Sequence, residues 1–220
     1  MRWTKQYINK DMLNVTDYNL PDIHLLVDKT KRFLIWIPDK RYIILGASNR
    51  AEVALYVENV KQDNITVLKR PSGGQTVMLT PNNLIVAVAF HQTNGLQPKD
   101  VFDKINSLII SVLEKEDIHN LSMKGISDIA IDGKKISGSA IYRKKDVLLY
   151  HAVINIGEPA TTFERYLKYP SKEPDYRNGR KHSEFVTSLK EIGYTKNYED
   201  LKSTMSQSFE TSLTKAGQLL

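Results

Sequence analysis

The amino-acid sequence predicts an α+β fold of the α/β-sandwich kind, in which a mixed β-sheet is flanked by helices. Short apolar segments with strand-like alternation occur in groups, and segments of helical periodicity separate those groups. No linker rich in proline or glycine divides the 220 residues, and no internal repeat is present. With 41% hydrophobic residues the chain can bury one substantial core, so we expect residues 1–220 to form a single domain.

The predicted strands fall into two groups. The first group comprises residues 33–37, 42–45, 65–69, 76–79 and 84–90, with the turn-prone tripeptide Pro38-Asp39-Lys40 between the first two. The second group is a meander of residues 128–131, 135–142 and 147–156. Asp132-Gly133 between the first two of these is suited to a type I′ hairpin turn, and residues 143–146 form the next turn.

Three helices are expected between and after these strands. Asn49 is a candidate cap for a helix over 49–60, whose apolar face would be Val53, Val57 and Val60. The strongest helical period covers 99–116, and a C-terminal helix begins near residue 199 with an apolar stripe of core residues. The polar stretch 170–180 contains two prolines and a glycine, which predicts a loop. Loops of this length often have a functional role.

Composition excludes several kinds of function. The chain has no cysteine, which removes disulfides, thiolate metal sites and thiol nucleophiles. The N-terminus is polar and the apolar runs are short, so we expect a cytoplasmic protein without a membrane span. The net charge of +6 would suit nucleic acid, a membrane or an acidic protein, but the basic residues are spread along the whole chain. We therefore expect no nucleic acid and no membrane partner.

Two segments carry candidate chemistry. The first is Arg70-Pro71-Ser72-Gly73-Gly74-Gln75-Thr76, a glycine-rich loop between strands that allows close approach of a ligand and offers Arg70 to an anion. Such a loop is, on its own, most often a tight turn, and it lacks the Gly-Lys-Ser/Thr of a P-loop. The second runs from Lys134 to Ala140, where small residues leave space for a ligand beside a lysine. The alternative for this second segment is an edge strand with two solvated lysines.

Together the two segments resemble the lipoate–protein ligase family. Members of that family carry an Arg-(Arg)-Ser-Gly-Gly-Gly loop, then an Asn-Asp or similar pair, then Gly-x-Lys-[Ile/Val]-Ser-Gly-Ser-Ala. The corresponding segments here are, in the same order, Arg70-Pro71-Ser72-Gly73-Gly74, Ser127-Asp128 and Gly133-Lys134-Lys135-Ile136-Ser137-Gly138-Ser139-Ala140. Tyr150-His151 falls where the family has a His pair ahead of an apolar strand. The resemblance is good over roughly residues 33–157 and weak elsewhere.

The resemblance implies a biotin/lipoate ligase-like catalytic core and a two-step reaction. Lipoate or octanoate would attack the α-phosphate of ATP to give acyl-AMP, and a lysine of an acceptor domain would then take the acyl group. Lys135 is the catalytic candidate, because one cation must bridge two anions. Asp128 would orient Lys135 or help to hold Mg²⁺, unless it simply begins a hairpin strand. Arg177 or Arg180 of the long loop would lie close to the adenylate.

The residues that would surround the acyl chain and adenylate come from both segments and from the apolar strand. They are Arg70, Ser72, Gly73, Gly74, Gln75, Thr76, Asp128, Ser137, Gly138, Ser139, Ala140 and His151. His151 is the weakest of these candidates, since a histidine on an apolar strand is often a hydrogen-bonded core residue. The expected acceptor is an acidic lipoyl-carrier domain, either an E2 lipoyl domain or a glycine-cleavage H protein, which suits a basic ligase surface.

The sequence departs from the family pattern at several points. Gln75 occupies the position of the family's third glycine, and Leu79 lies near the position of its usual histidine. In these departures the sequence resembles the related octanoyltransferases, which work through a cysteine. The Gly-Arg-Gly-Arg loop of biotin ligases is missing. Little chain remains for a C-terminal accessory domain, so either the ligase is a single-domain form or a separate polypeptide supplies that part. Three alternatives therefore stay open: a cysteine-independent acyl transferase, a non-catalytic lipoate- or partner-binding relative, and, more distantly, a nucleic-acid-binding protein.

Overall fold

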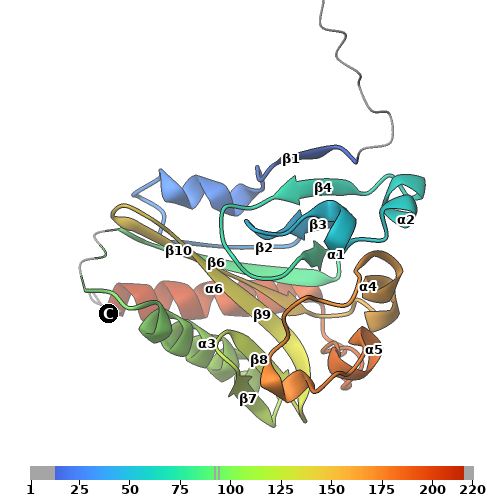
Figure 1. The fold of residues 1–220 in the computed structure, drawn as a ribbon. Coiled ribbons are helices and arrows are strands. Elements are labelled where there is room, and N and C mark those ends of the chain that lie inside the picture. Colours follow the sequence, from blue (N-terminus) through green and yellow to red (C-terminus); the bar gives the residue numbers. More distant parts are fainter. Residues whose placement is uncertain (1–12, 92, 94, 216–220) are drawn as a thin grey trace, which may run out of the picture.

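Two β-sheets form the centre of the fold (Figure 1). The computed structural model describes residues 13–215 apart from 92 and 94. The smaller sheet has the strand order β1-β4-β3-β5 and is mixed, because β1 and β3 run parallel to β4 whereas β5 runs antiparallel to β3. Its strands are β1 (Val15–Asp17), β3 (Tyr42–Leu45), β4 (Thr66–Lys69) and β5 (Val77–Leu79).

The larger sheet is antiparallel throughout, with the order β2-β6-β10-β9-β8-β7. Its strands are β2 (Phe33–Trp36), β6 (Asn83–His91), β7 (Leu121–Lys124), β8 (Asp128–Ile131), β9 (Lys134–Lys144) and β10 (Val147–Asn155). Asp132 and Gly133 between β8 and β9 both have positive φ, at 47° and 74°. These angles confirm the type I′ turn that the sequence predicts.

Helices cover the outer faces of both sheets, which confirms the predicted α+β fold with helices flanking a mixed β-sheet. The strands form two sheets, however, and only the smaller one is mixed. The helical elements are η1 (Pro21–Leu26), α1 (Ala51–Ala54), α2 (Val57–Gln62), α3 (Pro98–Lys115), α4 (Ala160–Tyr166), η2 (Asp175–Arg177), α5 (His182–Phe185) and α6 (Tyr198–Lys215). No helix in the described part of the chain is long and apolar enough to cross a membrane.

Successive residues along the strands of the larger sheet point to opposite faces, so the hydrophobic core is divided into clusters on the two sides of this sheet. Leu84, Val86 and Val88 of β6 pack with Ile105 of α3 and Phe209 of α6, beneath the larger sheet in Figure 1. Residues of the opposite face, such as Ile85, pack against the smaller sheet. The outer face of the smaller sheet packs on α1, α2 and α4. Period-2 alternation therefore directs every second residue of β6 and β10 towards the space between the sheets.

The expectation of one helix over 49–60 is wrong. The chain forms α1 and α2 with Leu55 extended between them (φ −124°, ψ 150°) and bridged to Leu167. Leu55 is completely buried, whereas Val53 is 58% exposed, so burial of Leu55 outweighs continuation of the helix. Asn49 does not cap the helix, because its side chain instead accepts hydrogen bonds from the Gly46 amide and the Thr76 hydroxyl.

Candidate functional site

A β-bulge at Ile136 decides where Lys135 points. In the pairing of β8 with β9, Ile129 faces Ser137 and Ala130 faces Lys135, so Ile136 is an extra residue. Strict alternation would place Lys135 and Gly138 on opposite faces of the sheet. The bulge brings them onto the same face, where Asp128 pairs with Gly138. Ile136 itself is 2% exposed and belongs to the core beneath the larger sheet.

Lys135 lies along Gly138 and forms an ion pair with Asp128. The distance from Lys135 Nζ to Asp128 Oδ1 is 2.8 Å. A Cβ on Gly138 would stand 2.7 Å from that Nζ, so a larger residue there would displace the end of the lysine side chain. Tyr176 donates a hydrogen bond of 2.9 Å to Asp128 Oδ2. Burial, and then the charge of Asp128, raise the pKa of the Tyr176 hydroxyl, so it stays protonated and able to donate.

The glycine-rich loop is shaped from within by Arg70. Its Nη2 donates to the carbonyl oxygens of Gly73 and Gln75 at 2.8 Å each. Arg70 is 5% exposed, and burial lowers its pKa to about 10, which leaves it charged near neutral pH. Only its Nε lacks a partner among the described residues. Arg70 therefore holds the loop by its contacts with backbone carbonyl oxygens, rather than presenting a free guanidinium.

The two loop glycines differ in what they require. Gly74 has φ +92°, which favours glycine, whereas a Cβ on Gly73 would meet no atom within 4 Å. Gly46, which lies outside both predicted segments, is more constrained, because a Cβ there would lie 2.1 Å from the Gly74 carbonyl oxygen. The close passage of two backbones therefore depends on Gly46 and Gly74.

A chain of buried polar groups connects this loop to the larger sheet. Ser72 Oγ and His151 Nε2 share a hydrogen bond of 2.8 Å, and His151 Nδ1 lies 3.4 Å from Asp22 Oδ2. Tyr18 donates a hydrogen bond of 2.7 Å to Asp22 Oδ1. Asp22 is completely buried and Ser72 is 1% exposed. Tyr18 and Asp22 have no signal in the sequence, because they come from a short segment before the first predicted strand.

Two cavities meet at Lys135. The larger, of about 680 Å³, is lined by Ile44, Val77, Leu79, Ile85 and His151 among others. The smaller, of about 320 Å³, lies towards α1, α4 and α5. Its lining includes the basic residues Arg50, Lys135, Lys168, Lys172 and Arg177. Lys135, Gly138, Gln75 and Val153 border both cavities, so the lysine stands at their junction.

The remaining predicted site residues take smaller roles in the geometry. Ser137 is buried and borders the smaller cavity, and Ala140 lines the larger one beside His151. The Ser139 hydroxyl donates to the Ser127 carbonyl oxygen. The Thr76 hydroxyl donates to Asn49, which ties the loop to the start of α1.

The long loop contributes one arginine to the smaller cavity. Arg177 is 4% exposed, stacks on the rings of Tyr169 and Phe185, and has an Nη2 with no partner in the described part of the chain. Arg180 instead donates to backbone carbonyl oxygens and holds the loop. Burial, and then the charge of Arg177, lower the pKa of His182 in the same cavity to about 4.

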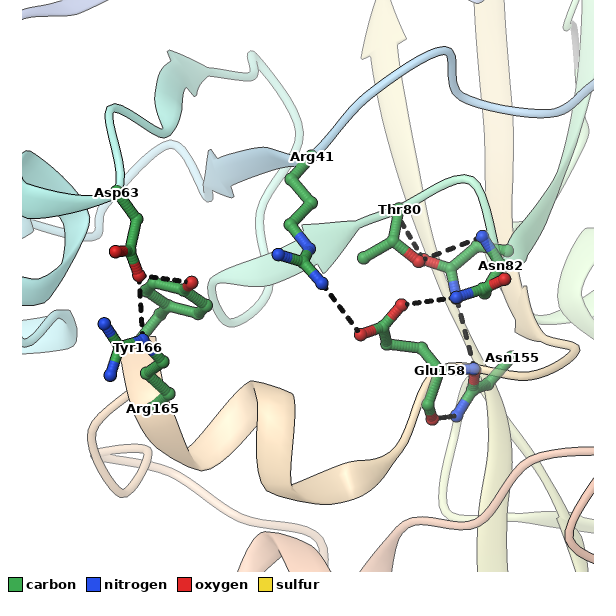
Figure 2. A network of polar contacts seen from close by, with 9 residues as sticks. Arg41, Asp63, Thr80, Asn82, Asn155, Glu158, Arg165 and Tyr166 are labelled. Atoms are coloured by element: carbon green, nitrogen blue, oxygen red, sulfur yellow. Dashed lines mark hydrogen bonds and ion pairs between the residues drawn. The ribbon is translucent and has the colours of Figure 1, made fainter.

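A network of polar contacts around Asn155 and Glu158 is drawn in Figure 2, and Asn155 lines the smaller cavity. Asn155 of β10 donates to the carbonyl oxygens of Glu158 and Thr187 and accepts from the Glu158 amide. The Glu158 carboxylate accepts from Asn82 and pairs with Arg41 at 3.9 Å. Because Asn155 is itself on the cavity wall, this network sets the position of the wall.

The sheets and helices have the fold of lipoate–protein ligases. A lipoate-protein ligase A bound with ATP superposes with a TM-score of 0.72 at 18% identity, covering 88% of this chain and 78% of the other. A bi-partite lipoate protein ligase of Thermoplasma acidophilum, studied with its E2 lipoyl domain, gives 0.72 at 16% identity, covering 91% and 83%. The model of the lipoyl protein ligase A/B catalytic domain matches residues 16–210, and the chain belongs to that family.

Relatives within the family carry different activities. Octanoyltransferase LipM of Oceanobacillus iheyensis is 22% identical over 205 residues, covering 85% of this chain and 74% of the relative. Lipoate-protein ligase A of Psychrobacter cryohalolentis is 24% identical, covering 86% and 52%. Inactive lipoate–protein ligase 2 of Plasmodium falciparum is 25% identical, covering 69% and 48%. The family membership supports a ligase or transferase in lipoate metabolism.

Proposed function

We propose that this protein is an ATP-dependent ligase that activates lipoate or octanoate as acyl-AMP and transfers the acyl group to a lysine of a lipoyl-carrier domain. The observation that supports this most is the position of Lys135 at the junction of two cavities, of which the smaller is lined by several basic side chains and the larger includes a group of apolar strand residues. The larger cavity would hold the acyl chain and the smaller one the nucleotide, which places the acid carboxylate and the α-phosphate on either side of the ammonium. Residues 1–220 would form one catalytic domain.

In the first step an oxygen of the acid carboxylate attacks the α-phosphorus of ATP, and the bond to pyrophosphate breaks. Two anions approach each other in this step, and Lys135 offsets their repulsion from a fixed position. Asp128 holds the ammonium in place, and Tyr176 in turn holds Asp128. Arg177 lines the smaller cavity and adds positive charge to the wall that would face the phosphates.

In the second step the amine of the acceptor lysine attacks the acyl carbon, and the bond from that carbon to AMP breaks. Negative charge grows on the acyl oxygen and then on the phosphate, and the same ammonium can stabilise both. One cation therefore serves both steps, as expected for a site without a protein nucleophile.

Mg²⁺ would accompany the triphosphate and neutralise part of its charge. Asp128 is the carboxylate beside Lys135, and both of its oxygens are already engaged. No group of three metal-ligating side chains occurs among the described residues. Each carboxylate oxygen keeps a second lone pair, so Asp128 together with substrate phosphates and water would fit a metal that arrives with ATP.

The proposed partner is an acidic lipoyl-carrier domain, either an E2 lipoyl domain or a glycine-cleavage H protein, in the cytoplasm. The net charge of +6 supports attraction to such an acceptor. One structural neighbour is a bi-partite ligase, so the proposed partners include a separate accessory polypeptide.

The second candidate function is transfer of an octanoyl group between carrier proteins without ATP, which the similarity to octanoyltransferases LipM favours. A third, binding without turnover, is favoured by the inactive relative. Intact-mass analysis of a lipoyl-domain acceptor separates all three. We expect a mass gain that requires both ATP and free acid. A gain from an acyl-carrier thioester without ATP would establish the transferase, and no gain with either donor would support the binding protein.

A further inference from the structure

His182 lines the smaller cavity and has no part in the two steps described above. It is the first residue of α5, and its ring makes no hydrogen bond to any residue that the structure describes. Neither ring nitrogen is shut off from solvent. Its charged neighbours in the chain, Lys181 and Glu184, are exposed, and the Glu184 carboxylate accepts a hydrogen bond from the Lys181 amide. The imidazole therefore borders the cavity with its nitrogens available to a ligand.

The place of this ring is fixed by hydrogen bonds on both sides of α5. On one side, the Thr187 amide donates a hydrogen bond of 3.0 Å to the carbonyl oxygen of Lys135 in β9. On the other side, the amide and the hydroxyl of Ser183 donate to Glu164 Oε1 of α4 at 2.9 and 2.7 Å. His182 is thus held in the same cavity wall as Lys135.

The charges in this wall favour an anionic ligand. Within the described part of the chain, basic side chains line the smaller cavity and no aspartate or glutamate does. The basic residues are Arg50, Lys135, Lys168, Lys172 and Arg177. A wall of this kind attracts phosphates and repels further positive charge. One more permanent cation would add to that repulsion.

The same charges oppose protonation of His182. Burial, and then the charge of Arg177, lower its pKa to about 4, while Glu164 of α4 raises it and Lys135 lowers it further. A negative charge near a base favours the protonated form of that base. Phosphates in the cavity would offset the charges of Arg177 and Lys135, and would thereby raise the pKa of His182 towards its usual value of about 6.5.

We infer that His182 is a phosphate-binding residue whose positive charge appears only when an anion enters the smaller cavity, so that a polyphosphate binds together with a proton. The inference rests on the proposed function for the identity of that anion, which is the triphosphate of ATP. A histidine supplies a cation while the phosphates are bound and adds no repulsion to the wall beforehand. An uncharged ligand such as adenosine takes up no proton.

The test measures the protons taken up when Mg-ATP binds in the absence of acid, so that no turnover occurs. Calorimetry at pH 6.5 in buffers with different enthalpies of ionisation gives this number, and adenosine is the matched ligand without phosphates. His182→Gln removes the titrating ring. His119→Gln is the matched control, because His119 is exposed and borders neither cavity. NMR titration of the histidine rings of the wild type follows the same proton directly.

We expect wild type and His119→Gln to take up about 0.5 proton per Mg-ATP at pH 6.5, and His182→Gln to take up almost none. Because the ring is more basic when the anion is bound, protonation favours binding at low pH, and this advantage is lost as pH rises through about 6.5. The affinity of wild type for Mg-ATP should therefore be about tenfold higher at pH 5.5 than at pH 8, and that of His182→Gln should change little.

Equal proton uptake in wild type and His182→Gln would overturn the inference. A wild-type titration in which no histidine ring becomes more basic with Mg-ATP would overturn it as well, even if His182→Gln failed to fold. Acyl transfer by a wild type that takes up no proton would leave the ligase standing and refute the role of His182. Uptake at His182 without pyrophosphate release on addition of acid would keep the phosphate site and refute the ligase. No binding of Mg-ATP would refute both.

Discussion

Gly138→Ala should separate activity from stability. The added Cβ would lie 2.7 Å from Lys135 Nζ and 2.8 Å from its Cε. Contacts this short do not persist, so the ammonium must move by roughly 1 Å to reach ordinary contact distance. A displacement of about 1 Å at a reacting centre costs on the order of 100-fold in rate. We therefore expect kcat/KM for acid-dependent pyrophosphate release to fall by about 100-fold, or about 2.7 kcal/mol of transition-state stabilisation.

The same substitution should leave the fold intact. Gly138 lies within β9 and is not among the glycines with positive φ, so alanine can adopt its backbone conformation. Alanine in a strand gains up to about 1 kcal/mol over glycine through the unfolded chain, and the clash falls on the movable end of a lysine. Urea unfolding should therefore give a free energy within about 1 kcal/mol of wild type.

A double variant checks that the added methyl group acts through the lysine. Lys135→Ala alone removes the cation, and adding Gly138→Ala to it should cause no further loss of kcat/KM. Additive losses would show that the methyl group obstructs a ligand directly. Wild-type activity in Gly138→Ala would refute the proposed position of Lys135.

Gly46→Ala places a Cβ 2.1 Å from the Gly74 carbonyl oxygen, so we expect a loss of about 1–3 kcal/mol of stability and weaker binding of the acid, measured by urea unfolding and calorimetry. Asn155→Ala should cost about 3 kcal/mol, because it leaves buried backbone groups at Glu158 and Thr187 without partners. An unchanged urea midpoint would show that water replaces the amide. His182, with its pKa lowered to about 4, is neutral in the folded protein at pH values where the unfolded chain takes a proton. Its contribution to stability is therefore lost as pH falls from about 6.5 towards 4. His182→Gln should flatten the dependence of the urea midpoint on pH in that window, and an equal slope in both proteins would contradict this.

The parts of the fold that follow local patterning could be predicted from the sequence. The meander was placed correctly because Asp132-Gly133 fixes its turn and apolar alternation fixes its faces. By contrast, the two strands that flank Pro38-Asp39-Lys40 belong to different sheets, since β2 pairs with β6 and β3 pairs with β4 and β5. Nothing local in those residues distinguishes a hairpin turn from a crossing between layers.

The candidate site was predictable in its residue types and less so in its geometry. Lys135 stood out in the motif, but the bulge at Ile136 that turns it towards Asp128 depends on how β8 and β9 pair. Arg70 has the appearance of an anion ligand in the sequence, whereas its Nη2 is directed at two backbone carbonyls of its own loop. Asp22 reaches His151 across 129 positions of the chain, a separation that no local pattern reports.

The most direct test of the central claim is acid-dependent pyrophosphate release from Mg-ATP, measured for wild type, Lys135→Ala and the matched control Lys134→Ala. The two lysines are adjacent, but Lys134 is exposed and Lys135 stands at the junction of the cavities. We predict release that requires lipoate or octanoate, little change in Lys134→Ala, and a loss of at least about 100-fold in Lys135→Ala, whose fold is retained although Asp128 loses its ion-pair partner. Release by Lys135→Ala at the wild-type rate would contradict the assignment of that residue, and no release by wild type would contradict activation by ATP.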